Sequence, residues 1–68
     1  MRRIKATELK KEHTGRRVSF TLKDTRIIGN LTVVDPFWMG SAVVSIEGIP
    51  CTLHLVEEDE IVLFGEGV

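Results

Sequence analysis

Residues 17–34 read RVSFTLKDTRIIGNLTVV, two alternating runs joined by a polar turn. In the first run, apolar residues alternate with polar ones, as in a strand with one buried face: Val18, Phe20 and Leu22. The second run, from about 26 to 34, has Gly29 in its middle, and a glycine inside a strand is typical where the strand bends or another backbone approaches. We therefore predict a hairpin with its turn at Asp24-Thr25 and a sharply bent second strand.

Three shorter strands are expected after this hairpin. We place a loop at 35–40, strands at 41–47, 49–56 and 60–64, a turn at Glu47-Gly48 and an acidic turn at 57–59. Residues 4–13 are rich in helix formers and lie just before Gly15, which predicts a short helix. Because a bent strand lets one sheet close on itself, the expected fold is all-β. It is a small, strongly bent five-stranded antiparallel barrel with a short N-terminal helix, in a single domain spanning 1–68.

The length and the charge distribution of the chain limit the classes of function it can have. A chain of 68 residues buries only about 60% of its unfolded surface, so an enzyme pocket is not expected. Residues 1–34 hold all nine Lys and Arg and three acidic residues, a net +6, whereas residues 35–68 hold seven acidic and no basic residues, a net −7. There is no long apolar run and no signal-peptide pattern, and Cys51 is the single cysteine. These features favour a cytoplasmic protein without a membrane segment.

Neither a metal site nor a cofactor is expected. Cys51 and His54 are three apart on an expected strand, so they would point to opposite faces. The run Glu57-Glu58-Asp59-Glu60 lacks the spacing of a cation-binding loop. No nucleophile, base and acid share a usable spacing, so the sequence does not predict an enzyme.

Residues 9–35 contain Gly15, a strand ending Leu22-Lys23-Asp24, Gly29 before Leu31, and Asp35. In these residues and their order, the segment resembles the Sm/Sm-like family. This resemblance implies a bent five-stranded barrel, assembly into rings and binding of single-stranded RNA. The chain departs from the family pattern at Thr25, where a glycine is usual, and in lacking the loop asparagine and the Arg of a later Arg-Gly pair; Phe64-Gly65 is the nearest counterpart of that pair.

The expected RNA-binding residues are two basic residues, two aromatic residues, an aspartate and a glycine: Lys23, Arg26, Phe37, Trp38, Asp35 and Gly65. Aromatic rings stack on unpaired bases, and Lys and Arg neutralise phosphates. Phe37 and Trp38 have an alternative role as a plug of the barrel or a contact with a neighbouring subunit. The basic residues have an alternative as a solvated or subunit-facing surface.

The expected oligomer interface is the last strand, where Ile61, Val62, Leu63 and Phe64 are apolar without alternation. An apolar edge strand favours pairing with another chain, and burial within the chain itself is the alternative. Two hypotheses follow: a homo-oligomeric ring that binds single-stranded RNA, and a structural or protein-binding oligomer without RNA.

Overall fold

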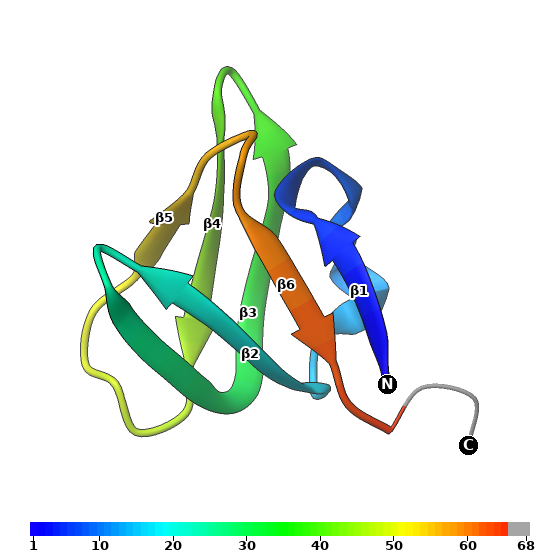
Figure 1. The fold of residues 1–68 in the computed structure, drawn as a ribbon, viewed down its shortest axis with the longest axis vertical. Helices are drawn as coiled ribbons and strands as arrows, with labels where there is room; N and C mark the ends of the chain where they lie inside the picture. The colour runs from blue at the N-terminus through cyan, green and yellow to red at the C-terminus, as the bar shows by residue number, and fades with distance from the viewer. Residues whose placement is uncertain (66–68) are drawn as a thin grey trace.

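The structure, a computed structural model, describes residues 1–65 and is built almost entirely of β-strands. Its elements are β1 (Arg2–Lys5), η1 (Ala6–Glu8), η2 (Lys11–His13), β2 (Arg17–Leu22), β3 (Thr25–Trp38), β4 (Ser41–Ile46), β5 (Leu53–Leu55) and β6 (Glu60–Leu63). The strands form one antiparallel sheet in the order β1-β6-β2-β3-β4-β5 (Figure 1). The predicted all-β class is confirmed.

The β2–β3 hairpin is present, and β3 bends strongly between its two ends (Figure 1). Val18 pairs with Gly29, and a Cβ at Gly29 would lie 2.6 Å from Cγ2 of the buried Ile46. The absence of a side chain therefore lets β3 and β4 approach each other at the bend. The turn is one residue earlier than predicted, at Lys23-Asp24, because Leu22 pairs with Thr25.

The predicted loop at 35–40 is wrong, because β3 continues to Trp38. Asp35 pairs with Val43 and Trp38 with Ser41, and a register shift between these pairs accommodates Pro36, which has no N–H to donate. Only Met39 and Gly40 form the turn to β4, and both have positive φ values, 50° and 97°. Asp35, Phe37 and Trp38 therefore lie in a strand, at one end of a long hairpin.

Replacing Met39 by asparagine is expected to stabilise the fold slightly. A methionine in the left-handed region is strained, whereas asparagine adopts that conformation readily in two-residue hairpin turns. Since the Met39 side chain is exposed, the substitution loses little packing. We expect the free energy of unfolding of Met39→Asn to rise by about 0.5–1 kcal/mol in urea titration. An unchanged or lower value would contradict this account.

The predicted helix at 4–13 is wrong. Residues 2–5 form β1, in which Ile4 pairs with Ile61, and the rest of the segment forms the short turns η1 and η2. The apolar positions explain this outcome, because Ile4 and Ala6 alternate as in a strand and too few apolar residues follow to make a helical stripe. Local polar contacts then favour turns: Glu8 Oε1 accepts from the Lys5 N–H at 2.8 Å, and His13 Nδ1 from the Lys10 N–H at 3.0 Å.

The sheet has six strands and is not closed into a barrel. The edge strands are β1 and β5, at opposite ends of the order β1-β6-β2-β3-β4-β5. A closed barrel would require pairing between β5 and a strand at the β1 end, and residues 1–65 form no such pairing. The strand predicted at 49–56 shrinks to β5, and Cys51 is exposed outside it. Pro50, which has no backbone N–H, lies in this non-strand segment.

The core lies inside the bend of the sheet and is apolar. Its buried hydrophobic residues are Ile4, Ala6, Leu9, Val18, Phe20, Leu31, Val34, Ala42, Val44, Ile46, Leu55, Ile61 and Leu63. Ala6 and Leu9 bring η1 and the residue after it into this core. Among residues 1–65, the short η turns are far from the length and apolarity a membrane-crossing helix needs.

Candidate nucleic-acid interface

One outward face of the sheet carries a row of three neighbouring residues on three strands: one basic, one apolar and one with a hydroxyl group. Val62 on β6 pairs with Arg3 on β1 and with Ser19 on β2, so the three side chains lie side by side on one face. One step along the sheet, the Phe64 N–H donates to the Arg17 carbonyl at 2.8 Å. Because alternate residues of a strand share a face, Phe64 and Arg17 lie on the same face as that row.

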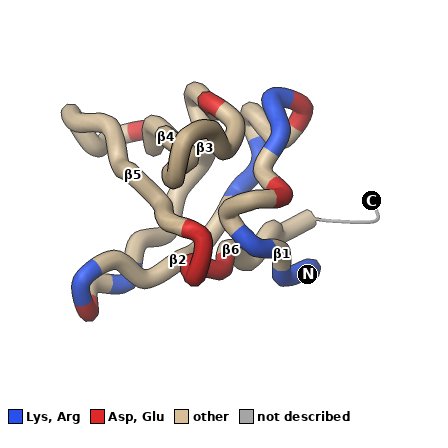
Figure 2. Tube along the Cα trace, turned by 90° about the horizontal axis from the view of Figure 1, so that it is seen from above, with Lys and Arg blue, Asp and Glu red and all other residues tan. Residues whose placement is uncertain are grey.

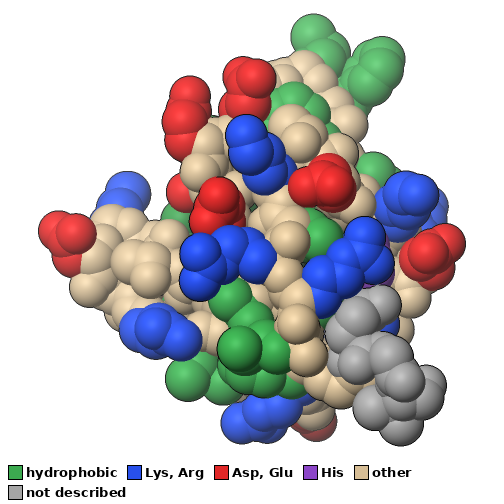
Figure 3. Space-filling model, turned by 45° about the vertical axis from the view of Figure 1, so that its right-hand side comes forward, with side chains coloured by type: hydrophobic (Ala, Val, Ile, Leu, Met, Phe, Trp, Pro, Cys, Tyr) green, Lys and Arg blue, Asp and Glu red, His purple; other side chains and the backbone are tan. Residues whose placement is uncertain are grey.

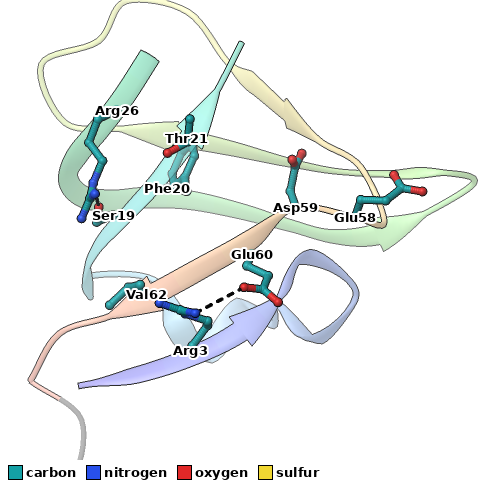
Figure 4. Close-up of a pocket in the computed structure, with 9 residues that line it drawn as sticks. All are labelled: Arg3, Ser19, Phe20, Thr21, Arg26, Glu58, Asp59, Glu60 and Val62. Carbon is teal, nitrogen blue, oxygen red and sulfur yellow. Dashed lines mark hydrogen bonds and ion pairs between the residues drawn. The ribbon is translucent and has the colours of Figure 1, made fainter. Parts of the chain in front are cut away.

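Arg26 reaches this face from β3. Its Nε–H donates to the Ser19 hydroxyl at 2.6 Å, and its side chain lies over Ser19, which is only 1% exposed (Figure 4). The hydrogen bond orients the guanidinium and accounts for the only polar side chain buried among the described residues. We call the set Arg3, Arg17, Arg26, Val62 and Phe64 the arginine face.

Two adjoining depressions hollow this face. The larger, about 510 Å³, is lined by Met1, Arg3, Arg26, Val62 and Phe64. The second, about 380 Å³, shares Arg3, Arg26 and Val62 with the first but is also lined by the carboxylates Glu58, Asp59 and Glu60 (Figure 4). Figure 3 shows hydrophobic side chains in the lower part of the molecule with basic side chains around them.

The charge of the face changes from one end to the other. Figure 2 shows the acidic stretch that leads into β6, close to the basic residues of β1. Arg3 Nη1 lies 3.8 Å from Glu60 Oε1, but both side chains are well exposed, at 70% and 50%, so this pair is weak. Within residues 1–65, the charged side chains that line the larger depression are those of Arg3 and Arg26, so no carboxylate is among them. An anion is therefore favoured at the Met1 and Phe64 end and disfavoured beside the acidic stretch.

The expected RNA-binding residues lie in three separate places. Arg26 belongs to the arginine face, and Gly65 follows Phe64 at its margin, with a φ of 75°. Lys23 lies in the β2–β3 turn. Asp35, Phe37 and Trp38 line a different depression of about 380 Å³ at the β3–β4 end.

Phe37 and Trp38 differ in burial. Trp38 is 76% exposed, whereas Phe37 is half-buried against the core. A single copy of the chain therefore does not bring the expected aromatic residues to Lys23, Arg26 or Gly65.

The expectation that residues 61–64 form an open edge strand is wrong. β6 lies between β1 and β2, so its backbone is paired on both sides, and Ile61 and Leu63 are buried in the chain's own core. β1 takes the edge position because residues 2–5 supply the missing partner. Of the four expected interface residues, Val62 and Phe64 remain on the outward face.

The expected RNA-binding set leaves out Arg3 and Arg17, although both belong to the basic N-terminal half of the chain. Arg3 precedes the helix predicted at 4–13, whereas in the structure exposed Arg3 and Lys5 alternate with buried Ile4 and Ala6, as in a strand. Arg17 precedes Val18 and so falls on the polar face of the predicted strand, but its nearness to Phe64 depends on β6 pairing with β2.

Within residues 1–65, no group of three or more His, Cys, Asp or Glu is placed to hold a metal ion.

Comparison with known proteins finds no matching family model, no similar curated protein and no similar solved structure. The resemblance to the Sm/Sm-like family therefore rests on the quoted residues of 9–35. What the chain does is argued below from the arginine face itself.

Proposed function

We propose that the chain binds single-stranded nucleic acid on the arginine face, and that the natural ligand is RNA, as the Sm/Sm-like resemblance implies. The observation that carries the proposal is the larger depression, which Phe64 and Val62 line together with Arg3 and Arg26. This combination supplies an aromatic surface for a base and two cations for its flanking phosphates.

The surroundings of Phe64 favour stacking on an unpaired base. The ring is half-buried, so its position is set by the sheet while part of it stays accessible. A guanidinium of Arg16 donates to the Phe64 carbonyl at 3.2 Å, which fixes the backbone at the end of β6. Stacking of a base on an aromatic side chain contributes about 1–3 kcal/mol.

We propose further that β2 to β6 form a small barrel-like unit of the Sm kind. Support comes from the bend of β3 at Gly29 and from β6 pairing back onto β2. Ring assembly through the edge of β6 is not part of this proposal, because β1 would have to leave that edge.

Fluorescence anisotropy of labelled oligo-U and oligo-A RNA tests the proposal. We expect Arg3→Ala/Arg26→Ala to weaken binding at low salt more than about tenfold, because two phosphate contacts are lost. The slope of log affinity against log salt should fall by about 0.7 for each phosphate contact removed. Phe64→Leu keeps apolar bulk without the aromatic ring and should weaken binding by about 5-fold or more.

Two matched variants locate the site. Lys11→Ala removes a charge from η2 and is expected to leave affinity within about 2-fold, since a single remote charge contributes little. Trp38→Ala should also leave affinity unchanged, whereas binding at the β3–β4 end would require Trp38. The absence of any RNA binding by the wild type at low salt, or equal losses in Lys11→Ala and the double arginine variant, would refute the proposal.

A further inference from the structure

A second outward surface lies on the other part of the sheet, over the end of β3, β4 and β5. Along β4, Ala42, Val44 and Ile46 are buried, so Ser41, Val43 and Ser45 face outward. The residues paired with these outward positions share the same face. None of them belongs to the arginine face.

This surface is unusually apolar for an exposed one. Val33, opposite Ser45, is 56% exposed, and Trp38, opposite Ser41, is 76% exposed. Val56 follows the buried Leu55, so strand alternation puts it on the outward face, where it is 46% exposed. Trp38 and Val43 also line the depression of about 380 Å³ at this end of the molecule. Such an accumulation of exposed apolar side chains marks an interaction site.

One cross-strand row of this surface carries an acid and a base on either side of a valine. Val43 pairs with Asp35 on β3 and with His54 on β5, so the row reads Asp35, Val43, His54. Both outer members are exposed, and neither forms an ion pair with another residue of 1–65. The row therefore has a carboxylate at one end, an imidazole at the other and an apolar side chain at its centre. We call Val33, Asp35, Trp38, Val43, His54 and Val56 the β4 face.

We propose that two copies of this chain pack through their β4 faces around a twofold axis parallel to β4 and passing by Val43. Such an axis exchanges the β3 side of one copy with the β5 side of the other. Val43 then meets Val43 of the second copy, and Asp35 of each copy faces His54 of the other. An imidazole can donate a hydrogen bond to a carboxylate in either protonation state, so both pairs are favourable.

The same operation matches the apolar residues. Trp38, on the β3 side of the Ser41 row, faces the β5 side of the second copy near Val56. A twofold contact of this type uses one patch twice, and it is the commonest symmetry among oligomers. The β4 face is complementary to itself in both charge and polarity. The partner expected on this face is therefore a second copy of the chain. This inference does not depend on RNA binding, because it uses none of the residues of the arginine face.

Exchanging the charged pair tests the symmetry directly. In sedimentation equilibrium, we expect His54→Asp to weaken dimerisation more than about tenfold, because two carboxylates then face each other twice. Asp35→His should also weaken it, by placing imidazole against imidazole. The double variant Asp35→His/His54→Asp restores the unlike pairs and should recover a dissociation constant within about 3-fold of the wild type. Failure of this recovery, with both singles weakened, would overturn the proposed axis.

A substitution at the proposed twofold axis tests dimerisation independently of the charged pair. Val43→Lys puts two ammonium groups together and should give a monomer, while Thr7→Lys, on the exposed η1 turn, adds the same charge elsewhere and should still dimerise. Circular dichroism checks that each variant is folded. A wild type that stays monomeric at about millimolar concentration, or a Val43→Lys variant that still dimerises, would refute the inference. RNA binding by monomeric Val43→Lys at wild-type affinity would show that the two surfaces act separately, whereas loss of RNA binding there would contradict their independence.

Discussion

The Leu63→Ala variant is expected to be largely unfolded at about 37 °C. Leu63 is fully buried, on the strand that joins β1 to β2, so its truncation leaves a cavity at the centre of the sheet. Replacing a buried leucine by alanine costs about 2–5 kcal/mol. A domain of 68 residues has a total stability of about 3–10 kcal/mol at 0.05–0.15 kcal/mol per residue, so the loss is comparable to the whole.

Val62→Ala is the matched control, because Val62 is the neighbouring residue but faces outward and is partly exposed. We expect it to lower the free energy of unfolding by less than about 1 kcal/mol. Urea denaturation followed by circular dichroism measures both variants. Equal destabilisation by the two substitutions would contradict the assignment of inner and outer faces along β6.

Gly29→Ala is expected to destabilise the protein by about 1–3 kcal/mol, the cost of an added methyl group in a filled core. The added Cβ would lie 2.6 Å from Cγ2 of Ile46. That methyl group is attached directly to the branched Cβ of a buried side chain, so it cannot move aside without a rotamer change or a shift of β4. For a domain of this size, the melting temperature should fall by roughly 4–8 °C per kcal/mol.

A second substitution separates steric overlap from a general loss of β3 stability. Ile46→Leu keeps the volume of the side chain but removes the methyl group branched at Cβ, and alone it should cost less than about 1.5 kcal/mol. The double variant Gly29→Ala/Ile46→Leu should lose less stability than the sum of the losses in the two single variants, by about 0.5 kcal/mol or more. Strict additivity in thermal melts would exclude the contact with Ile46 as the cause.

The sequence predicts most of the strands because their apolar residues alternate clearly. β2, β4 and β6 lie within about one residue of the expected bounds, and Gly29 is where a neighbouring strand approaches. The N-terminal segment fails for a tertiary reason. Residues 2–5 become a strand because β6 offers an unpaired edge, and nothing within residues 4–13 encodes that edge. Helix propensity was therefore outweighed by pairing with a distant part of the chain.

The candidate site was less predictable than the fold, because its members come from β1, β6, β2 and β3. Arg26 was expected to bind RNA, but its approach to Phe64 and Val62 follows from β6 lying next to β2. Trp38 stands out in the sequence as the single tryptophan, yet the continuation of β3 carries it away from the basic residues. Composition and motif identify side chains of the right chemistry, whereas strand order decides which of them meet.

The position of β6 between β1 and β2 also determines when the chain can fold. Arg2 pairs with Leu63, and Val18 pairs with the same residue on the other side, so β1 and β2 both need residues 60–63 to complete their pairing. While residues 60–63 remain inside the ribosome, β1 has no partner and β2 has only β3. Folding of the complete sheet therefore requires residues 60–63, and this non-local pairing favours slow folding for so small a domain.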